Sequence, residues 1–314
     1  MLTRVPFTRR ALAAASLLAL CGAGAAAPKQ ADEQYRFAAA GNQFARPDGE
    51  ARLKQLVADN TEAAQAFMVV IGIKGAAEPC NDKLYERRRE LLDDARRPLI
   101  VAPAAADWSE CKVGGRTVSA ERLARWREIF AAEPATLGKH ALPVSRLSNT
   151  AKFRSYAENA YWDVGGVLYA TINLPSNNNH YRPEAGRNSE FEDRLVANRF
   201  WLHQLFAFAR RDKRSAVVLF SDGDVKALSQ PTGLRALLGR PSGSARDGYE
   251  EVRKQIVGLA QKFSGKVLLV DTAAPEGGTP AIVWRGRLGH LSVGSKVVDV
   301  RVDPDTTGMF TVRE

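Results

Sequence analysis

The feature that most constrains the fold is a pattern that occurs twice in the first part of the chain. In each copy a short apolar run, Phe67–Ile71 or Pro98–Ala102, precedes a loop of small residues, and a cysteine follows, Cys80 or Cys111. Continuous aliphatic runs of this length are typical of strands that are buried on both faces. Because α/β proteins place functional residues on the loops after such strands, we expect two adjacent loop tips at one edge of a sheet.

The rest of the chain predicts more strands of this kind, with helices between them. Strands are expected at 35–40, 156–162, 167–174, 216–220, 266–270 and, in short pieces, from Ile282 to Val312, with a Gly165-Gly166 hairpin turn. Helices are expected at 50–60, 82–96, 119–130, 188–212 and 248–263, and Asn81-Asp82 can cap the second one. This order predicts an α/β fold, a four-layer sandwich of two mixed sheets flanked by helices. The loops after the main strands should gather at one end.

The N-terminus has the composition of a cleaved export signal. Three arginines precede an apolar run and then small residues: Arg4, Arg9 and Arg10, Ala11–Leu20, and residues 21–25. We expect a signal peptide at 1–25, a disordered leader at 26–34 and a single domain at 35–314, in a periplasmic or secreted protein. The arginine pair also allows the twin-arginine route, and Cys21 allows a lipoprotein, which Leu20 disfavours.

Charge and hydropathy argue against a nucleic-acid partner and against a membrane span. Removal of the signal takes away three arginines and no acids, and so lowers the net charge from +10 to +7. The excess is spread along the chain, without a basic stripe interleaved with aromatics, so we expect no nucleic-acid partner. No later run approaches the roughly 18 to 20 apolar residues that a membrane span needs, so we expect no span.

Two cysteines, Cys80 and Cys111, remain after the signal is removed. Cysteines in an oxidising compartment most often pair, and the similar positions of these two after neighbouring strands favour a disulfide. Two buried free thiols are the alternative. Because the twin-arginine route carries folded proteins, it agrees with a disulfide only if the pair oxidises late.

Several short segments match, in order and spacing, the motifs of one known family. They are Ile73-Lys74 with Glu78-Pro79-Cys80, Pro103 with 107–111, Glu121–Phe130, Leu137–Lys139, Glu158-Asn159 with Trp162, and Ser176–Asn179. The combination resembles the calcineurin-like metallophosphoesterase family, in particular a secreted bacterial branch, over roughly residues 35 to 275. The resemblance implies loop tips on which aspartates, an asparagine and histidines hold two divalent metals. Such a metal pair activates a water and clamps a phosphate.

The same resemblance implies that these metal ligands are missing here. The aspartate of the first motif falls on Asn42, the bridging aspartate falls on Gly72, and the Gly-Asp-Asn of the third motif falls on Ala104-Ala105-Ala106. The late His-Gly-Asp-x-His falls on residues 271–275, and the histidines His140, His180, His203 and His290 all lie elsewhere. Loss of a bridging carboxylate together with the imidazoles should abolish a two-metal site, so we expect no metal cofactor.

The leading hypothesis is therefore a non-catalytic pseudoenzyme that binds an unknown ligand or protein partner at the old cleft. The residual cleft is expected at the former motif positions, which are Asn42, Gly72, Lys74, Ala105, Ala106, Asp107, Asn177, Asn178, Asp222, Asp224 and Asp271. Within this set, Lys74 with Asn177 and Asn178 is a candidate for binding an anion.

Two other hypotheses remain open. In the first, a working metal-dependent phosphoesterase uses a rebuilt site of Asp222, Asp224 and Asp271, with Asp107 and Asn42, to hold one Ca²⁺ or Mg²⁺. Each of these aspartates is also explained as a helix cap or turn residue. In the second, the chain is a structural or interaction protein whose contact surfaces are the loops at 175–183 and 229–247.

Overall fold

The computed structural model describes residues 34–45, 47–59, 65–183, 188–229, 246–273, 278–304 and 306–313. All of them belong to one compact unit, Asp32–Glu314. The expected signal peptide, almost all of the leader and most of the loop at 229–247 lie outside these ranges.

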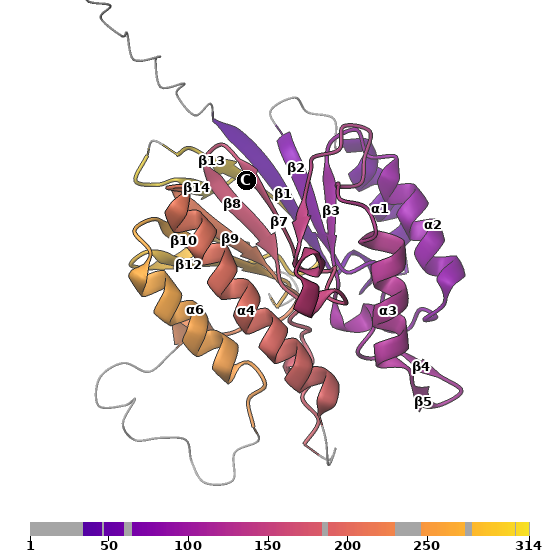
Figure 1. The fold of residues 1–314 in the computed structure, drawn as a ribbon. Coiled ribbons are helices and arrows are strands. Elements are labelled where there is room, and N and C mark those ends of the chain that lie inside the picture. Colours follow the sequence, from indigo (N-terminus) through magenta and orange to yellow (C-terminus); the bar gives the residue numbers. More distant parts are fainter. Residues whose placement is uncertain are drawn as a thin grey trace, which may run out of the picture. The chain divides into compact units, whose positions relative to one another are not determined.

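Two sheets of mixed strand direction form the centre of this unit (Figure 1). Within the described ranges, the first sheet has the order β14 (Phe310–Val312), β13 (Val297–Val302), β1 (Tyr35–Gly41), β2 (Gln65–Ile71), β3 (Leu99–Ala102). The second has the order β11 (Val283–Arg285), β12 (Leu288–Ser292), β10 (Lys266–Asp271), β9 (Ala216–Phe220), β8 (Val167–Thr171), β7 (Ala160–Val164), β6 (Ser145–Arg146). Strands β1, β2 and β3 are mutually parallel, and so are β8, β9, β10 and β12. A small hairpin, β4 (Lys112–Val113) and β5 (Arg116–Thr117), stands apart from both sheets.

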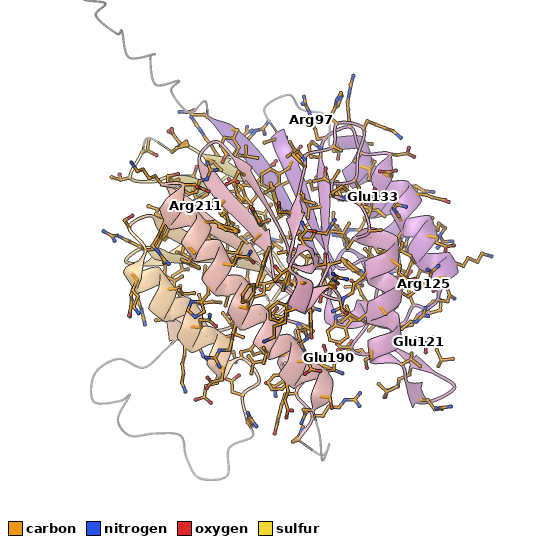
Figure 2. The ribbon with its side chains drawn as sticks, viewed as in Figure 1. Arg97, Glu121, Arg125, Glu133, Glu190 and Arg211 are labelled. Atoms are coloured by element: carbon orange, nitrogen blue, oxygen red, sulfur yellow. A yellow bond between two sulfur atoms is a disulfide. The ribbon has the colours of Figure 1, made fainter. Side chains whose placement is uncertain are left out.

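Helices cover the outer face of each sheet. Helices α1 (Gly49–Asp59), α2 (Asp82–Asp93) and α3 (Ser119–Phe130) lie on the first sheet, and α4 (Ser189–Arg211) and α6 (Glu250–Lys262) lie on the second (Figure 1). Short 3₁₀ turns occur in the loops: η1 (Gln43–Ala45), η2 (Ala105–Asp107), η3 (Leu147–Asn149), η4 (Ala151–Phe153), η5 (Asn178–His180) and η6 (Ala227–Ser229). Figure 2 shows Glu190 and Arg211 at opposite ends of α4, where their charges complement the helix dipole.

The alternation of side chains along the strands divides the core into three clusters. On β1, Phe37 packs between the two sheets, whereas Ala38 faces α1–α3. On β9, Phe220 packs between the sheets, whereas Leu219 faces α4 and α6. Both faces of the main strands are therefore buried, and the layers run helix, sheet, sheet, helix, as the sequence predicts.

Most expected elements are present, and the three largest differences are elements with shorter ends. The strand expected from residue 156 begins only at Ala160, because Asn159 turns its side chain into a buried network, accepting the Asn173 N–H at 2.9 Å. The second helix ends at Asp93, three residues early, and β8 ends at Thr171. The Asn81 cap is confirmed, since its side chain accepts the Leu84 N–H at 2.9 Å.

The Cys80–Cys111 disulfide is confirmed, with Cα atoms 5.8 Å apart. It ties the loop after β2 to the loop after β3. The expected hairpin turn is also confirmed, with positive φ at Gly165 and Gly166. In the part of the chain that the structure describes, no helix has the length and hydropathy of a membrane span.

Candidate functional site

Loops from both sheets meet at the carboxyl ends of the parallel strands, as predicted. The Asn42 amide donates to the Thr272 carbonyl at 3.3 Å and so links the tip after β1 to the tip after β10. The Ser109 hydroxyl donates to the Asn177 side-chain oxygen at 3.1 Å and links the tip after β3 to the tip after β8. Residues that are far apart in the sequence therefore build one surface.

Asp222 lies where these tips converge. One of its carboxylate oxygens accepts the N–H groups of Ala105 at 2.7 Å and Ser176 at 2.8 Å, and the other accepts the Thr272 hydroxyl at 2.8 Å. Its direction follows from the strand, since Phe220, two residues earlier, also packs between the sheets. Three donors thus occupy most of the roughly four lone-pair positions of the carboxylate. One side chain joins tips of both sheets.

Asp107 has the same role between β2 and β3. Its fully buried carboxylate accepts the N–H groups of Ile73 at 3.0 Å, Lys74 at 3.3 Å and Ala104 at 2.9 Å. Burial raises the pKa of Asp107 to about 7, although these backbone donors and the Lys74 charge act to lower it. The carboxylate therefore holds two loop tips and does not face solvent.

The residues expected to bind an anion are engaged elsewhere. The Lys74 ammonium donates to the carbonyls of Gly75 at 2.7 Å and Ala106 at 2.9 Å, and burial lowers the pKa of this lysine. Asn178 joins a neighbouring loop, because its side-chain oxygen accepts the Gly248 N–H at 2.9 Å. Lys74 lines the central cleft, whereas Asn178 lines a different cavity.

A cleft of about 680 Å³ lies over the loop tips. Of the positions expected to form it, five line its wall: Asn42, Lys74, Ala105, Ala106 and Asp222. The others are not part of this lining: Gly72, Asp107, Asn177, Asn178, Asp224 and Asp271. At Gly72 the backbone has a φ of 85°, and a Cβ would lie 3.0 Å from the Ala104 side chain. A side chain at that position is therefore strained.

The cleft wall contains a network of ion pairs around Arg88. This buried guanidinium lies 2.9 Å from Glu50 and 2.6 Å from Glu78, and it stacks 4.0 Å from the centre of the Phe44 ring. Among the lining residues that the structure describes, two are cationic and four are carboxylates, namely Lys74 and Arg88 against Glu50, Glu78, Glu110 and Asp222. The described wall is therefore net acidic.

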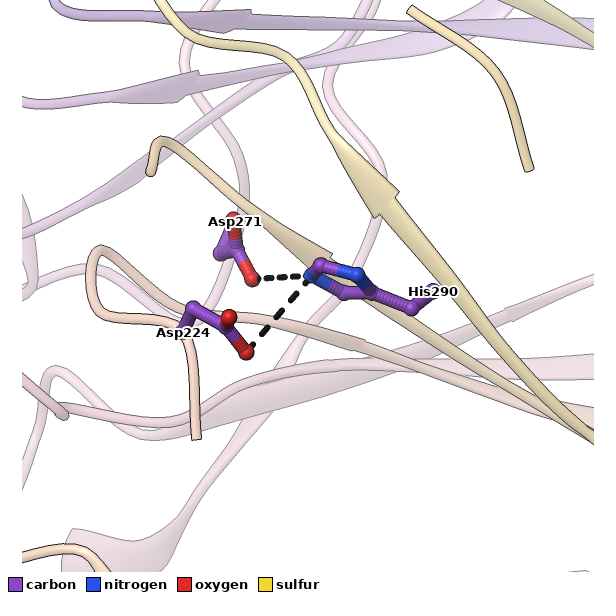
Figure 3. A group of neighbouring side chains, drawn as sticks. All are labelled: Asp224, Asp271 and His290. Carbon is purple, nitrogen blue, oxygen red and sulfur yellow. Dashed lines mark hydrogen bonds and ion pairs between the residues drawn. The ribbon is translucent and has the colours of Figure 1, made fainter. Parts of the chain in front are cut away.

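A second group of polar side chains lies near the end of the second sheet (Figure 3). The His290 ring nitrogen Nε2 lies 2.6 Å from the Asp271 carboxylate and 3.7 Å from that of Asp224. His290 is on β12, and β12 pairs in parallel with β10, the strand that ends at Asp271. Burial lowers the pKa of His290, but the hydrogen bond to Asp271 and the two carboxylate charges outweigh it, so the pKa is raised.

This second group faces away from the cleft. On β10, Leu269 packs toward α4 and α6, whereas Val270 packs between the sheets. Because strand side chains alternate, Asp271 lies on the helix side and Asp222 on the inner side. The structure therefore brings Asp224 and Asp271 together with a histidine, while Asp222 is held by the loop tips.

His290 is the functional candidate that the sequence did not indicate. All four histidines lie away from the ligand positions that the family resemblance implies, and so no function was expected of His290. Only the register of β12 against β10, which pairs Leu269 with His290, places its ring beside Asp271. His180, the histidine closest to an expected tip, is buried with its ring 5.1 Å from that of Trp108, and burial lowers its pKa to about 4.

Comparisons with known proteins bear on the fold of the chain. No protein-family model matches the chain, and no curated protein matches it. Among solved structures, a dimetal phosphatase from Danio rerio is similar, with a TM-score of 0.50, 9% sequence identity, and 85% of this chain and 92% of that chain covered. The chain thus has a metallophosphoesterase-type fold, in agreement with its sequence motifs.

Proposed function

We propose that this protein is an exported, non-catalytic member of the metallophosphoesterase superfamily, from the secreted bacterial branch that its motifs resemble. Its cleft binds a ligand or a protein partner in place of two metals. The observation that carries this proposal is the environment of Asp222, which accepts hydrogen bonds from Ala105, Ser176 and Thr272.

A two-metal centre needs carboxylates and imidazoles whose lone pairs are available. At the tips of this chain, Ala105 and Ala106 offer methyl groups, and Asp107 and Asp222 are already acceptors for three donors each. A metal taking these lone pairs would leave buried N–H groups unpaired, at a cost of about 1 to 3 kcal/mol for each group. Carboxylates thus join the tips that a metal pair would otherwise hold.

The charges of the cleft suggest the class of ligand. Lys74 directs its ammonium at carbonyls, and Arg88 is paired with Glu50 and Glu78. A phosphate entering the cleft would meet a net acidic wall with both described cations engaged. We therefore propose a neutral or cationic ligand, with Phe44 as the apolar contact beside it.

Two observations support export. The first 25 residues contain arginines that are followed by an apolar run and then by small residues. Cys80 and Cys111 form a disulfide, and such bonds persist mainly in oxidising compartments.

A working metal-dependent phosphoesterase with a rebuilt site is the second candidate. It is favoured by one observation, the approach of Asp224, Asp271 and His290, whose ligand atoms all lie within 4.8 Å of one another. Asp222 and Asp107, the other carboxylates expected in that site, accept hydrogen bonds from the loop tips instead.

Hydrolysis assays on the mature protein test both candidates. We expect no metal-dependent hydrolysis of p-nitrophenyl phosphate or bis(p-nitrophenyl) phosphate with Mn²⁺, Zn²⁺, Mg²⁺ or Ca²⁺. A rate that a chelator abolishes would contradict the non-catalytic proposal. Its loss in an Asp222→Asn variant that is still folded by circular dichroism would then assign the activity to the cleft, and its loss in a folded His290→Ala variant would assign it to the rebuilt site.

A further inference from the structure

We propose that Asp224, Asp271 and His290 bind a single divalent cation of the Zn²⁺ type, outside the cleft, and that this ion fixes the loop after β9 to the ends of β10 and β12. This site goes beyond the proposed non-catalytic function, which concerns the cleft alone, and it gives a structural role to the group that the second candidate would use for hydrolysis. In the described residues, these three side chains form a group whose nitrogen and oxygen atoms converge within 4.8 Å (Figure 3).

The present geometry is close to that of a metal site. Tetrahedral Zn²⁺ holds nitrogen and oxygen ligands at about 2.0 to 2.2 Å, which separates neighbouring ligand atoms by roughly 3.3 to 3.6 Å. His290 Nε2 is 2.6 Å from Asp271 and 3.7 Å from Asp224. The two carboxylate oxygens lie within 4.8 Å of each other, so side-chain shifts on the order of 1 Å bring the three atoms to coordinating distances.

The paired strands of the second sheet hold the backbone of two of these ligands in place. Asp271 is the last residue of β10, and His290 lies on β12, hydrogen-bonded in parallel to it. Asp224 follows β9, the neighbour of β10 on its other side. Ligands on adjacent strands of one sheet are held more rigidly than ligands on separate loops.

Hydrogen bonds from the surroundings orient the most buried ligand. The oxygen of Asp271 that does not face His290 accepts the Ala273 N–H at 3.0 Å and the Ser292 hydroxyl. Such outer partners are typical of metal-binding carboxylates and fix their direction. The Asp271 side chain is 4% exposed, whereas those of His290 and Asp224 are 23% and 26% exposed. The group is thus anchored on one side and open to an entering ion on the other.

The donor set selects the type of cation. One imidazole with two carboxylates suits Zn²⁺ and similar transition metals. Ca²⁺ prefers six to eight oxygen ligands, and Mg²⁺ prefers oxygens in octahedral geometry. The proposed site therefore differs from the Ca²⁺ or Mg²⁺ site that the sequence suggested, because a histidine replaces Asp222 as the third ligand.

Metal binding by conservative variants tests this proposal. After equilibration with Zn²⁺ and gel filtration, elemental analysis of the mature protein should give about one ion per chain, with Ca²⁺ failing to compete. His290→Ala and Asp224→Asn should each weaken Zn²⁺ binding by about 100-fold or more in calorimetric titration. His203→Ala, an exposed histidine on α4, is the matched control and should bind as the wild type does.

Hydrogen exchange supplies a readout that does not depend on stoichiometry. Zn²⁺ should slow exchange at the amides of residues 224–229 in the wild type and in His203→Ala, but not in His290→Ala. A wild type that binds no Zn²⁺, or variants that bind it unchanged, would overturn the proposal. Zn²⁺ binding lost in Asp222→Asn but kept in His290→Ala would overturn it too, and would also contradict the proposal that the cleft holds no metal. Absence of hydrolysis bears on the proposed function alone.

Discussion

The Asp222 carboxylate accepts the Ala105 N–H at 2.7 Å, and this bond joins the loop after β9 of one sheet to the loop after β3 of the other. In the family that the sequence resembles, the motif that falls on Ala105 is implied to supply a metal ligand. Here the backbone N–H of that residue, and not its side chain, makes the connection. An internal hydrogen bond thus links tips that metal ions would link in an active enzyme.

Replacing Asp222 should therefore destabilise the fold. Asp222→Ala leaves the N–H groups of Ala105 and Ser176 and the Thr272 hydroxyl without their acceptor, so we expect a loss of about 3 kcal/mol or more of unfolding free energy. Urea denaturation of the wild type and of the variant measures this loss. Asp59→Ala, an exposed aspartate on α1, is the control and should change stability by less than about 0.5 kcal/mol. Equal effects of the two substitutions would show that Asp222 is not a structural link.

Glycine 72 should resist substitution. Gly72→Ala places a Cβ 3.0 Å from that of Ala104 at a φ of 85°, so we expect about 1 to 2 kcal/mol of destabilisation. Gly258→Ala is the matched control, because a Cβ at this position in α6 meets no atom within 4 Å. It should stabilise by up to about 1 kcal/mol, since alanine favours the helix. The shifts in the midpoint of thermal unfolding should differ in sign between the two variants. Stabilisation by Gly72→Ala would contradict the positive φ and the close approach to Ala104 at this position.

The stability of the protein should depend on pH through Asp107. Burial raises its pKa from 3.8 to about 7 in the folded state, so between these values the folded chain holds a proton that the unfolded chain has lost. This group therefore lowers stability as pH rises from about 4 to 7, by up to about 1.4 kcal/mol per pH unit, and has no further effect above pH 7.

Asp107→Asn removes this titration and should flatten the profile. Unfolding free energy of the wild type and of Asp107→Asn, measured in urea from pH 4 to 8, gives the difference in slope. Asp107→Asn is also expected to be less stable at every pH, because an amide nitrogen would face the Ala104 N–H. Parallel profiles would mean that Asp107 titrates normally.

The disulfide should contribute substantially to stability. Cys80 and Cys111 close a loop with a sequence separation of 31, for which the chain-entropy model gives about 3 to 4 kcal/mol. Reduction should lower the midpoint of thermal unfolding of the wild type. It should leave the midpoint of a Cys80→Ala/Cys111→Ala double variant unchanged. A wild-type midpoint that does not change on reduction would contradict a stabilising role of the disulfide.

Much of the fold follows from local sequence. Continuous apolar runs such as Phe67–Ile71 predicted the buried strands, and periodic apolar positions with the Asn81 cap predicted the helices. The strand expected from residue 156 was wrong at its start, because Asn159 makes contacts with residues distant in sequence. Alternation along a chain carries no information about such contacts.

The site was harder to predict than the fold. The tips after the strands were located correctly, and Asp224 and Asp271 do lie together. The position of the third member, His290, depends on which strand pairs with β12 and in which register. Likewise, nothing local distinguishes Asp222, turned inward toward Ala105, from Asp224, turned toward His290.

The most direct measurement is the metal content of the His290→Ala variant after incubation with Zn²⁺ and Mn²⁺. This substitution removes the ring that completes the Asp224–Asp271 group, so any ion that still binds tightly lies at another site, of which the cleft is the candidate that the fold provides. Because the Asp222 carboxylate of the cleft already accepts hydrogen bonds from three donors, we expect close to zero ions per chain. One or two tightly bound ions per chain would contradict this expectation and restore the cleft as a metal centre.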